Sequence, residues 1–190
     1  MLVLVRPGEY FLKSERTRRF FEQILIKNIK RALPDCEVEL ERGRLFVRTG
    51  SRKALRCLAK LPGISSVSPV LEAKPEVDDI ARKSIRMLRR KLKEGMSFAV
   101  RTRVVGQHPF SSRYINERVG DAIKRAKNVT VDLESPDLLL EIEVRGQKAY
   151  LSCRRLQGVG GLPVGAEGRV ISLCRGRPED LLSTWFALKR

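Results

Sequence analysis

The spacing of apolar residues changes repeatedly along residues 1–73, and this succession constrains the fold more than any other feature of the sequence. In chain order it predicts a strand over 3–5, a helix over 15–33, strands over 37–40 and 45–48, a helix over 51–61 and a strand over 64–71. Pro34 ends the first helix. That helix is expected to bury one face, made of Phe20, Phe21, Ile24, Leu25, Ile29 and Leu33. The order β-α-β-β-α-β is the ferredoxin-like arrangement.

A second block, over residues 74–168, again combines the apolar spacing of helices with that of strands. The predicted elements are a helix over 76–94, a strand over 98–104, a helix from 111 or 112 to 126, a short strand over 129–133 and a hairpin of 138–145 with 148–154. The predicted fold class is therefore α+β, an N-terminal ferredoxin-like domain followed by an α/β domain. Residues 169–190 form a third, C-terminal part.

The charge balance favours a polyanionic partner. Lys and Arg number 39 against 22 Asp and Glu, which gives a net charge of +17. Nucleic acid is the favoured ligand, with an anionic membrane surface or a merely solubilising surface as alternatives. The apolar runs are too short to span a bilayer, and the start of the chain lacks the pattern of a signal peptide. We therefore expect a soluble, cytoplasmic protein.

Phosphate binding needs long cationic side chains in fixed positions, and arginine can grip phosphate bidentately. Arg101 and Arg103 are two residues apart on a predicted strand and so share a face, about 6 to 7 Å apart. Other candidates lie on the last helix of the second block and at the end of its hairpin. These further candidates are Arg113, Lys124, Arg154 and Arg155.

The glycine-rich segment 158–168 allows two interpretations. Glycines permit close backbone approach, so the N–H groups of Gly160, Gly161 and Leu162, beside the stiffening Pro163, could meet phosphate or a base edge. The alternative is an ordinary linker.

Recognised catalytic and metal-binding motifs are absent from the sequence. It contains no intact phosphate-binding loop, no G-x-S-x-G and no H-E-x-x-H. Cys36, Cys57, Cys153 and Cys174 form no C-x-x-C pair, and His108 has no neighbouring ligand candidates. We expect no metal, no cofactor, and cysteines that act as small core residues in a reducing compartment.

Several motifs are similar to those of the tRNA 4-thiouridine synthetase family. Gly-Gly-Leu-Pro-Val-Gly at 160–165, with Gly-Arg-Val-Ile-Ser-Leu at 168–173, resembles the exit from that family's THUMP domain. Gly-Glu-Tyr-Phe-Leu-Lys at 8–13 resembles its opening pattern. Further motifs follow in the same order at 43–44, 62–69, 97–101, 117–120, 132–137 and 141–143. The resemblance implies a ferredoxin-like domain over 1–73 and a THUMP domain over 74–168, which hold tRNA by its acceptor stem and 3′ end through shape and phosphate contacts.

One segment departs from the family. There a pyrophosphatase domain follows and opens with a Ser-Gly-Gly-x-Asp-Ser loop that holds ATP phosphates. The corresponding residues here, 175–180, read Arg-Gly-Arg-Pro-Glu-Asp, so the serines and the second glycine are missing and Pro178 lacks an N–H donor. We expect 169–190 to be a degenerate, truncated remnant of that domain's start, without ATP binding.

The sequence thus predicts a non-catalytic tRNA-binding protein that presents tRNA to a separate modification enzyme, most simply one of thiolation. Two alternatives stay open: a general binder of structured RNA, and a stand-alone tRNA-modifying enzyme with a site near His108, Asp132 or Glu179. Leu182, Trp185 and Phe186 are expected to pack on their own domain rather than on a partner. A homodimer is a further option, since an exposed apolar helix favours association.

Overall fold

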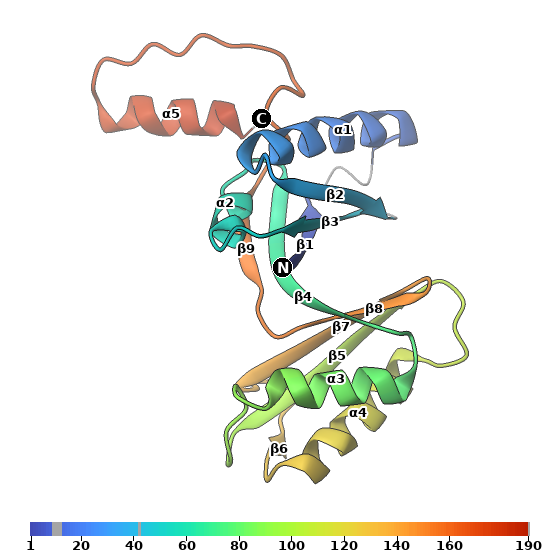
Figure 1. The fold of residues 1–190 in the computed structure, drawn as a ribbon. Helices are drawn as coiled ribbons and strands as arrows, with labels where there is room; N and C mark the ends of the chain where they lie inside the picture. Colours follow the sequence, from blue (N-terminus) through green and yellow to red (C-terminus); the bar gives the residue numbers. More distant parts are fainter. Residues whose placement is uncertain (9–12, 42, 190) are drawn as a thin grey trace. The chain divides into compact units, whose positions relative to one another are not determined.

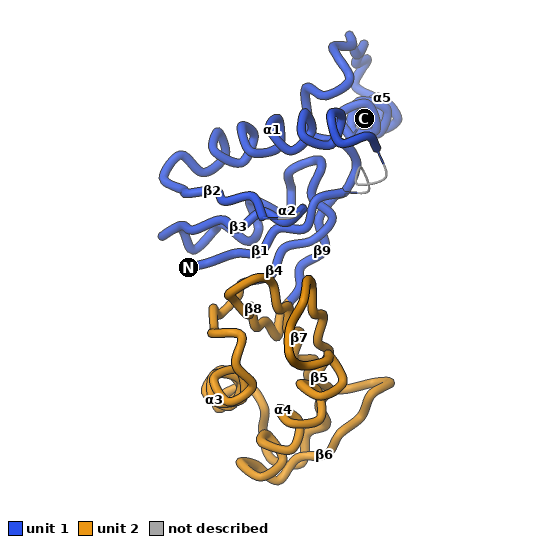
Figure 2. The backbone as a smooth tube through the Cα atoms, turned by 90° about the vertical axis from the view of Figure 1, so that its right-hand side faces the viewer, with its two compact units in different colours: residues 1–69, 155–190 blue, residues 70–154 orange. Residues whose placement is uncertain are grey.

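The computed structural model describes residues 1–8, 13–41 and 43–189. The chain forms two compact units, distinguished by colour in Figure 2: unit 1 comprises residues 1–69 and 155–190, and unit 2 comprises residues 70–154. Most of the expected opening motif, at 9–12, lies outside the described residues. Within the described ranges no helix has the length and apolar character needed to cross a membrane.

Unit 1 contains the predicted β-α-β-β-α-β succession (Figure 1). Its elements are β1 (Leu2–Pro7), α1 (Glu15–Ala32), β2 (Cys36–Glu41), β3 (Arg44–Thr49), α2 (Ala54–Ala59) and β4 (Ile64–Ala73), whose last residues enter unit 2. β3 pairs antiparallel with both β1 and β2, and β4 adjoins β1, so the strand order is β2-β3-β1-β4. The ferredoxin-like prediction is therefore confirmed.

Helix α1 covers this sheet through one narrow stripe. Phe21, Leu25 and Ile29, at spacings of four, are at most 4 % exposed and join the core of unit 1. The prediction that Phe20 shares this buried face is wrong, because Phe20 is 49 % exposed. Each residue advances about 100° around a helix, so Phe20 lies one step outside the stripe. Ser14 caps the helix by accepting the N–H of Thr17 at 3.3 Å.

Strand β9 (Leu156–Gly160) adds a further strand to unit 1. It pairs antiparallel with β4, with Leu156 opposite Val67 and Gly160 opposite Ile64. Residues 155–168 thus lie in unit 1, whereas the sequence pattern assigned them to the second domain. The difference arises because strand pairing across about ninety residues leaves no trace in local periodicity.

Unit 2 packs two helices on one face of a mixed sheet (Figure 1). Its elements are α3 (Val77–Leu88), β5 (Ser97–Val105), α4 (Ser112–Ala126), β6 (Thr130–Val131), β7 (Leu138–Arg145) and β8 (Lys148–Ser152). β5 runs parallel to β6 and β7, while β8 runs antiparallel to β7 and to the end of β4. Even-numbered residues of β5 and β7, such as Val100 and Ile142, enter the helix-covered core. Odd-numbered residues therefore point to the other face.

Helix α3 is shorter than the sequence pattern predicts. It ends at Leu88 rather than near residue 94, and the chain then turns, with the Leu92 N–H donating to the Leu88 carbonyl at 2.9 Å. Lys127, just after α4, donates its Nζ to the Arg89 carbonyl at 2.8 Å and to the Leu92 carbonyl. A distant lysine therefore satisfies carbonyls that the helix end leaves without partners, and a local pattern cannot indicate this.

Candidate nucleic-acid interface

Arg101 and Arg103 lie where the sequence predicts, on one face of β5. Both side chains are exposed, on the face of the sheet that α3 and α4 leave uncovered. Arg101 donates its Nη2 to the carbonyl of Leu133 at 3.1 Å, which orients its guanidinium group. The strand thus presents two neighbouring arginines on one face, and the contact with Leu133 fixes the direction of Arg101.

Acidic residues of β7 lie beside these arginines. In the parallel register Arg101 is opposite Glu141 and Arg103 is opposite Glu143. Glu143 is itself buried and forms an ion pair of 2.6 Å with the buried Arg145. The charge of Glu143 is therefore largely compensated within the sheet, so it offsets little of the attraction of Arg103 for an anion.

Arg113 and Lys124 are exposed on one stripe of α4, with Glu117 between them. Arg113 Nε is 2.8 Å from Glu117 Oε1, and this hydrogen bond raises the pKa of Arg113. The pair is largely solvent-exposed, so solvent screens it and a phosphate can compete for the guanidinium group.

Arg154 and Arg155 are consecutive and exposed, but they are anchored differently. The Ser152 hydroxyl donates to the Arg154 carbonyl at 3.0 Å and accepts its N–H at 3.3 Å, which fixes the backbone after β8. Arg155 donates its Nε to the Ser66 hydroxyl on β4 at 3.0 Å. Arg155 therefore has a structural contact, while the Arg154 contacts involve only its backbone.

The glycine-rich segment packs tightly within unit 1. A Cβ on Gly158 would lie 2.2 Å from the Ile64 carbonyl oxygen, and one on Gly161, whose φ is +75°, would lie 2.2 Å from that of Lys189. The N–H of Leu162 donates to the same Lys189 carbonyl at 2.8 Å. Close backbone approach within the fold accounts for both glycines.

Pro163 continues this packing. It is buried, and a Cβ on Gly63 would lie 2.9 Å from its Cγ. Gly63 donates its N–H to the Gly160 carbonyl at 2.8 Å. Contact of residues 160–163 with RNA stays a prediction that needs its own test.

Residues 175–180, which the resemblance aligns with an ATP-binding loop, fold around their own carboxylate. Gly176 has a φ of +84°, and α5 (Pro178–Leu188) begins two residues later. The N–H groups of Arg175 and Arg177 both donate to Asp180 Oδ2, at 2.6 and 3.3 Å. A carboxylate therefore occupies the N-terminal position of the helix, where a bound phosphate would otherwise accept such N–H groups.

Helix α5 leaves its apolar residues exposed. Leu182, Trp185 and Phe186 are 58 %, 40 % and 62 % exposed, and α5 buries none of its residues. The prediction that these side chains pack on their own domain is therefore wrong. The preceding segment is equally open, with Ile171 93 % exposed.

The candidate catalytic residues have local structural roles. His108 stacks on Phe110, with ring centroids 5.4 Å apart and planes inclined by 20°. The Asp132 carboxylate accepts the N–H groups of Glu134 and Ser135 at 2.9 and 3.0 Å, which closes a turn. Glu179 is exposed in the first turn of α5.

Cysteines and metal ligands are dispersed. In the part of the chain that the structure describes, no three His, Cys, Asp or Glu side chains gather in a way that could hold a metal ion. Cys36, Cys57 and Cys153 are half-buried beside the two cores. Cys174 is exposed, so the prediction of a core position is wrong for this residue.

Models of two protein families match the two units. The ThiI ferredoxin-like domain matches residues 2–68, and the THUMP domain matches residues 74–154. The second match ends at the residue where unit 2 ends.

Similar proteins align with the whole chain. A protein of Methanosarcina acetivorans named "Probable tRNA sulfurtransferase" is 37 % identical over 199 residues, which cover 100 % of this chain and 48 % of that protein. A protein of the same name from Methanocaldococcus jannaschii is 36 % identical over 203 residues, covering 100 % and 53 %. The chain thus spans about half the length of the curated relatives it matches.

Two solved structures share the fold. The crystal structure of PH1313 from Pyrococcus horikoshii Ot3 superposes with a TM-score of 0.91 at 35 % identity, covering 100 % of this chain and 65 % of the other. A complex of a 4-thiouridine synthetase with RNA and bound ATP superposes with a TM-score of 0.85 at 27 % identity, covering 100 % and 50 %.

Proposed function

Because the chain belongs to the family that joins a ThiI ferredoxin-like domain to a THUMP domain, we propose that it binds tRNA and takes part in tRNA thiolation. It is homologous to the N-terminal half of tRNA sulfurtransferases. The whole-chain alignment with proteins named for tRNA is the observation that carries this proposal. The net charge of +17 and the RNA held by a structural neighbour support it. The partner is tRNA, held at its acceptor stem and 3′ end, and the compartment is the cytoplasm.

In this proposal the chain itself is not catalytic and presents tRNA to a separate modification enzyme. Support comes from the start of α5, where the Asp180 carboxylate accepts hydrogen bonds from the N–H groups of Arg175 and Arg177. Pro178 has no N–H group that could bind a phosphate. We expect the purified chain to show no ATP binding in equilibrium dialysis. Formation of 4-thiouridine by this chain alone, with ATP and a sulfur donor, would contradict the assignment.

The residues that we assign to tRNA contact are exposed cations of unit 2, together with Arg155 and the glycine-rich segment of unit 1. They would recognise A-form RNA by phosphate position and shape rather than by base sequence. The proposed contacts are Arg101, Arg103, Arg113, Lys124, Arg154, Arg155, Gly160, Gly161, Leu162 and Pro163.

The experiment that tests this function is binding of labelled tRNA, with and without its 3′ CCA end, across a salt series. We expect affinity to fall steeply with salt, since each neutralised phosphate releases counterions. The double variant Arg101→Glu/Arg103→Glu should weaken binding roughly tenfold or more and reduce the salt slope by about two.

The matched control is Arg52→Glu/Lys53→Glu, which changes the net charge equally at two exposed, consecutive positions before α2. It should leave the slope nearly unchanged. Equal losses in both double variants would mean that only the overall charge attracts RNA, and failure of the wild-type chain to bind tRNA at moderate salt would refute the proposed function.

A further inference from the structure

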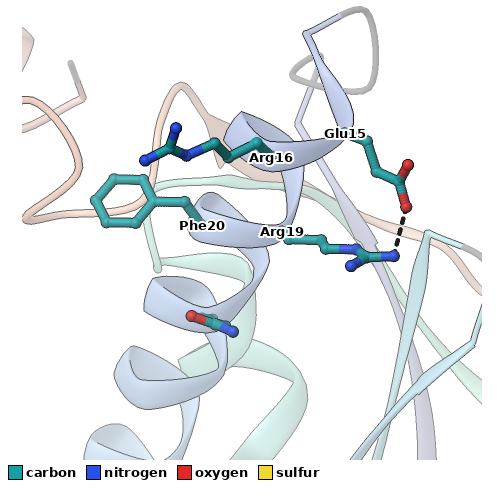
Figure 3. A pocket seen from close by; sticks show the side chains of 5 residues that line it. Glu15, Arg16, Arg19 and Phe20 are labelled. Atoms are coloured by element: carbon teal, nitrogen blue, oxygen red, sulfur yellow. Dashed lines mark hydrogen bonds and ion pairs between the residues drawn. The ribbon is translucent and has the colours of Figure 1, made fainter.

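An open hollow on α1 and a more enclosed pocket in unit 2 differ in what they can hold. The hollow on α1 is lined in part by Arg16 and Arg19, which point to opposite sides of the helix (Figure 3). These two arginines therefore cannot grip one ligand together, and Arg19 is already paired with Glu15. The pocket in unit 2 instead joins an apolar floor to a cationic rim, so its parts can act on the same ligand.

This pocket, the α3–α4 pocket, lies where the last turns of α3 and α4 meet, on the helix-covered face of the unit 2 sheet (Figure 1). It has a volume of about 230 Å³, and its apolar lining consists of Ile85, Leu88, Leu92, Ile123 and Ala126. Leu88, Leu92 and Ile123 are at most 2 % exposed and belong to the packed core, while Ala126 is exposed at the edge. The floor of the pocket is therefore a preformed part of the fold.

Lys127 fixes one wall of the α3–α4 pocket. Its Nζ donates to the carbonyls of Arg89, at 2.8 Å, and of Leu92, and these bonds join the ends of the two helices. Arg89 also lines the pocket and is exposed. Arg86 lies three residues before it, so the two exposed arginines are neighbours on the surface of α3. The rim thus presents two guanidinium groups beside an aliphatic floor.

The size and the lining of the pocket decide between classes of ligand. Small-molecule sites occupy roughly 300–1,000 Å³, so a pocket of about 230 Å³ suits a single apolar side chain better. A nucleotide base is disfavoured, because the lining contains no aromatic ring on which a base could stack. An apolar side chain of another protein would be surrounded here by aliphatic groups, as an anchor residue is at the centre of a protein–protein interface.

The charges around the pocket specify the surroundings of that anchor residue. Arg86 and Arg89 attract carboxylates, which a guanidinium group can bind through two hydrogen bonds, and they repel a basic surface. A second copy of this chain, with its net charge of +17, is therefore a poor occupant. The complementary surface is an acidic segment that carries an apolar side chain between its carboxylates.

We propose that the α3–α4 pocket is a docking site for an acidic amphipathic segment of a partner protein, with one apolar side chain in the pocket and carboxylates against Arg86 and Arg89. This inference rests on the proposed function, because it gives the separate modification enzyme a surface on which to dock. Arg101 and Arg103 lie on the opposite face of the unit 2 sheet, so tRNA contacts there do not use the pocket.

The test uses the full chain and a fluorescein-labelled peptide of about 15 residues, with leucines at every third or fourth position among glutamates. Fluorescence anisotropy measures its binding. Ala126→Trp should weaken binding about tenfold or more, because the indole ring fills the opening of the pocket. Ala126→Ser is the matched control, since it leaves the pocket open and should not change the affinity. A peptide with serines in place of the leucines should bind as weakly as Ala126→Trp binds the original peptide.

The contribution of charge is tested separately. Arg89→Glu should weaken binding of the leucine–glutamate peptide about tenfold, because like charges then face each other. Arg118→Glu makes the same charge change at an exposed residue of α4, about 12 Å along the helix from Ala126, and should have little effect. Thermal melts establish that each variant folds.

Methyl NMR of the full chain locates the bound peptide. The signals of Ile85 and Ile123 should shift on titration, whereas that of Ile64, in the core of unit 1, should not. Shifts that spare Ile85 and Ile123, or wild-type affinity in Ala126→Trp, would overturn the assignment. Equal losses in Arg89→Glu and Arg118→Glu would also overturn it, because only the overall charge would then attract the peptide. Shifts of the same two signals by single-stranded RNA and not by the peptide would identify the occupant as nucleic acid instead.

Binding of labelled tRNA distinguishes failure of this inference from failure of the proposed function. If the wild-type chain binds tRNA but not the peptide, the pocket is not a docking site of this kind and the function stands. If it binds the peptide at the pocket but not tRNA, the proposed function fails, and so does the identification of the partner as a tRNA-modifying enzyme. Ala126→Trp should keep the wild-type affinity for tRNA, since the pocket is not assigned to RNA.

Discussion

At the scale of single residues, close backbone approaches explain glycines that a sequence pattern leaves ambiguous. Gly158→Ala would place a Cβ 2.2 Å from the Ile64 carbonyl oxygen, and this neighbour is backbone of the paired strand β4, which is costly to displace. We expect this variant to lose about 1–3 kcal/mol of unfolding free energy, measured by urea denaturation. Gly50→Ala is the control, because a Cβ there meets nothing within 4 Å. Equal stability of the two variants would show that β9 adjusts freely.

A second residue-scale prediction concerns Asp79, which is 6 % exposed and ties the start of α3 to the loop before it. Its carboxylate accepts the N–H of Lys74 at 2.8 Å and binds Lys83 at 3.0 Å, as well as Arg82. The Lys74 N–H, followed by Lys83 and Arg82, holds the pKa of Asp79 well below its usual range.

Because the folded pKa of Asp79 is depressed, its contribution is complete above the unfolded pKa of about 3.9 and is lost as the pH falls below that value. The wild-type chain should therefore lose more unfolding free energy than Asp79→Asn when the pH is lowered from about 6 to 3. Denaturation curves at several pH values measure this difference. Parallel pH profiles for the two proteins would exclude a stabilising role of the charged carboxylate.

At the scale of elements, α4 contains one residue that weakens it. Gly120 lies in the helix interior, half-buried, and a Cβ there would meet nothing within 4 Å. Gly120→Ala should raise the unfolding free energy by about 0.5–1 kcal/mol, since alanine loses less backbone entropy in a helix. Chemical denaturation measures the gain in unfolding free energy. A loss of stability would contradict the prediction, because it would mean that the added methyl group collides with a neighbouring residue.

Helix α5 illustrates the limit of an amphipathic pattern. Leu182, Trp185 and Phe186 have the spacing of a buried face, yet all three are exposed. Periodicity predicts that a face is apolar but does not identify what covers it. A homodimer through such a surface stays a prediction, which sedimentation equilibrium can check.

At the scale of the whole molecule, each unit has its own apolar core. The core of unit 2 includes Ile80, Phe98, Ile115 and Ile142, and that of unit 1 includes Leu25, Val47 and Ile64. A fragment of residues 70–154 should therefore fold alone, with a cooperative urea transition and dispersed amide NMR signals. A fragment without a cooperative transition would show that unit 2 depends on the rest of the chain.

The sequence alone determined much of this protein. Apolar spacing predicted the β-α-β-β-α-β order of unit 1, the β5–α4 segment and the hairpin of 138–145 with 148–154, whose second strand ends at Ser152 in the structure. These patterns reflect which side of a single helix or strand is buried. Motif order predicted the THUMP and ferredoxin-like domains. The exposure of Arg101 and Arg103 on one face followed from strand alternation.

Only the tertiary structure decided the remaining features, which depend on residues distant in sequence. Strand β9 joins unit 1 through pairing with β4, and α3 ends at Leu88 where Lys127 reaches its carbonyls. Phe20 differs from Phe21 in exposure although the two are adjacent and identical. The physical reason is common to all three: the free energy of burial or pairing belongs to a contact between segments, and local sequence encodes only one side of that contact.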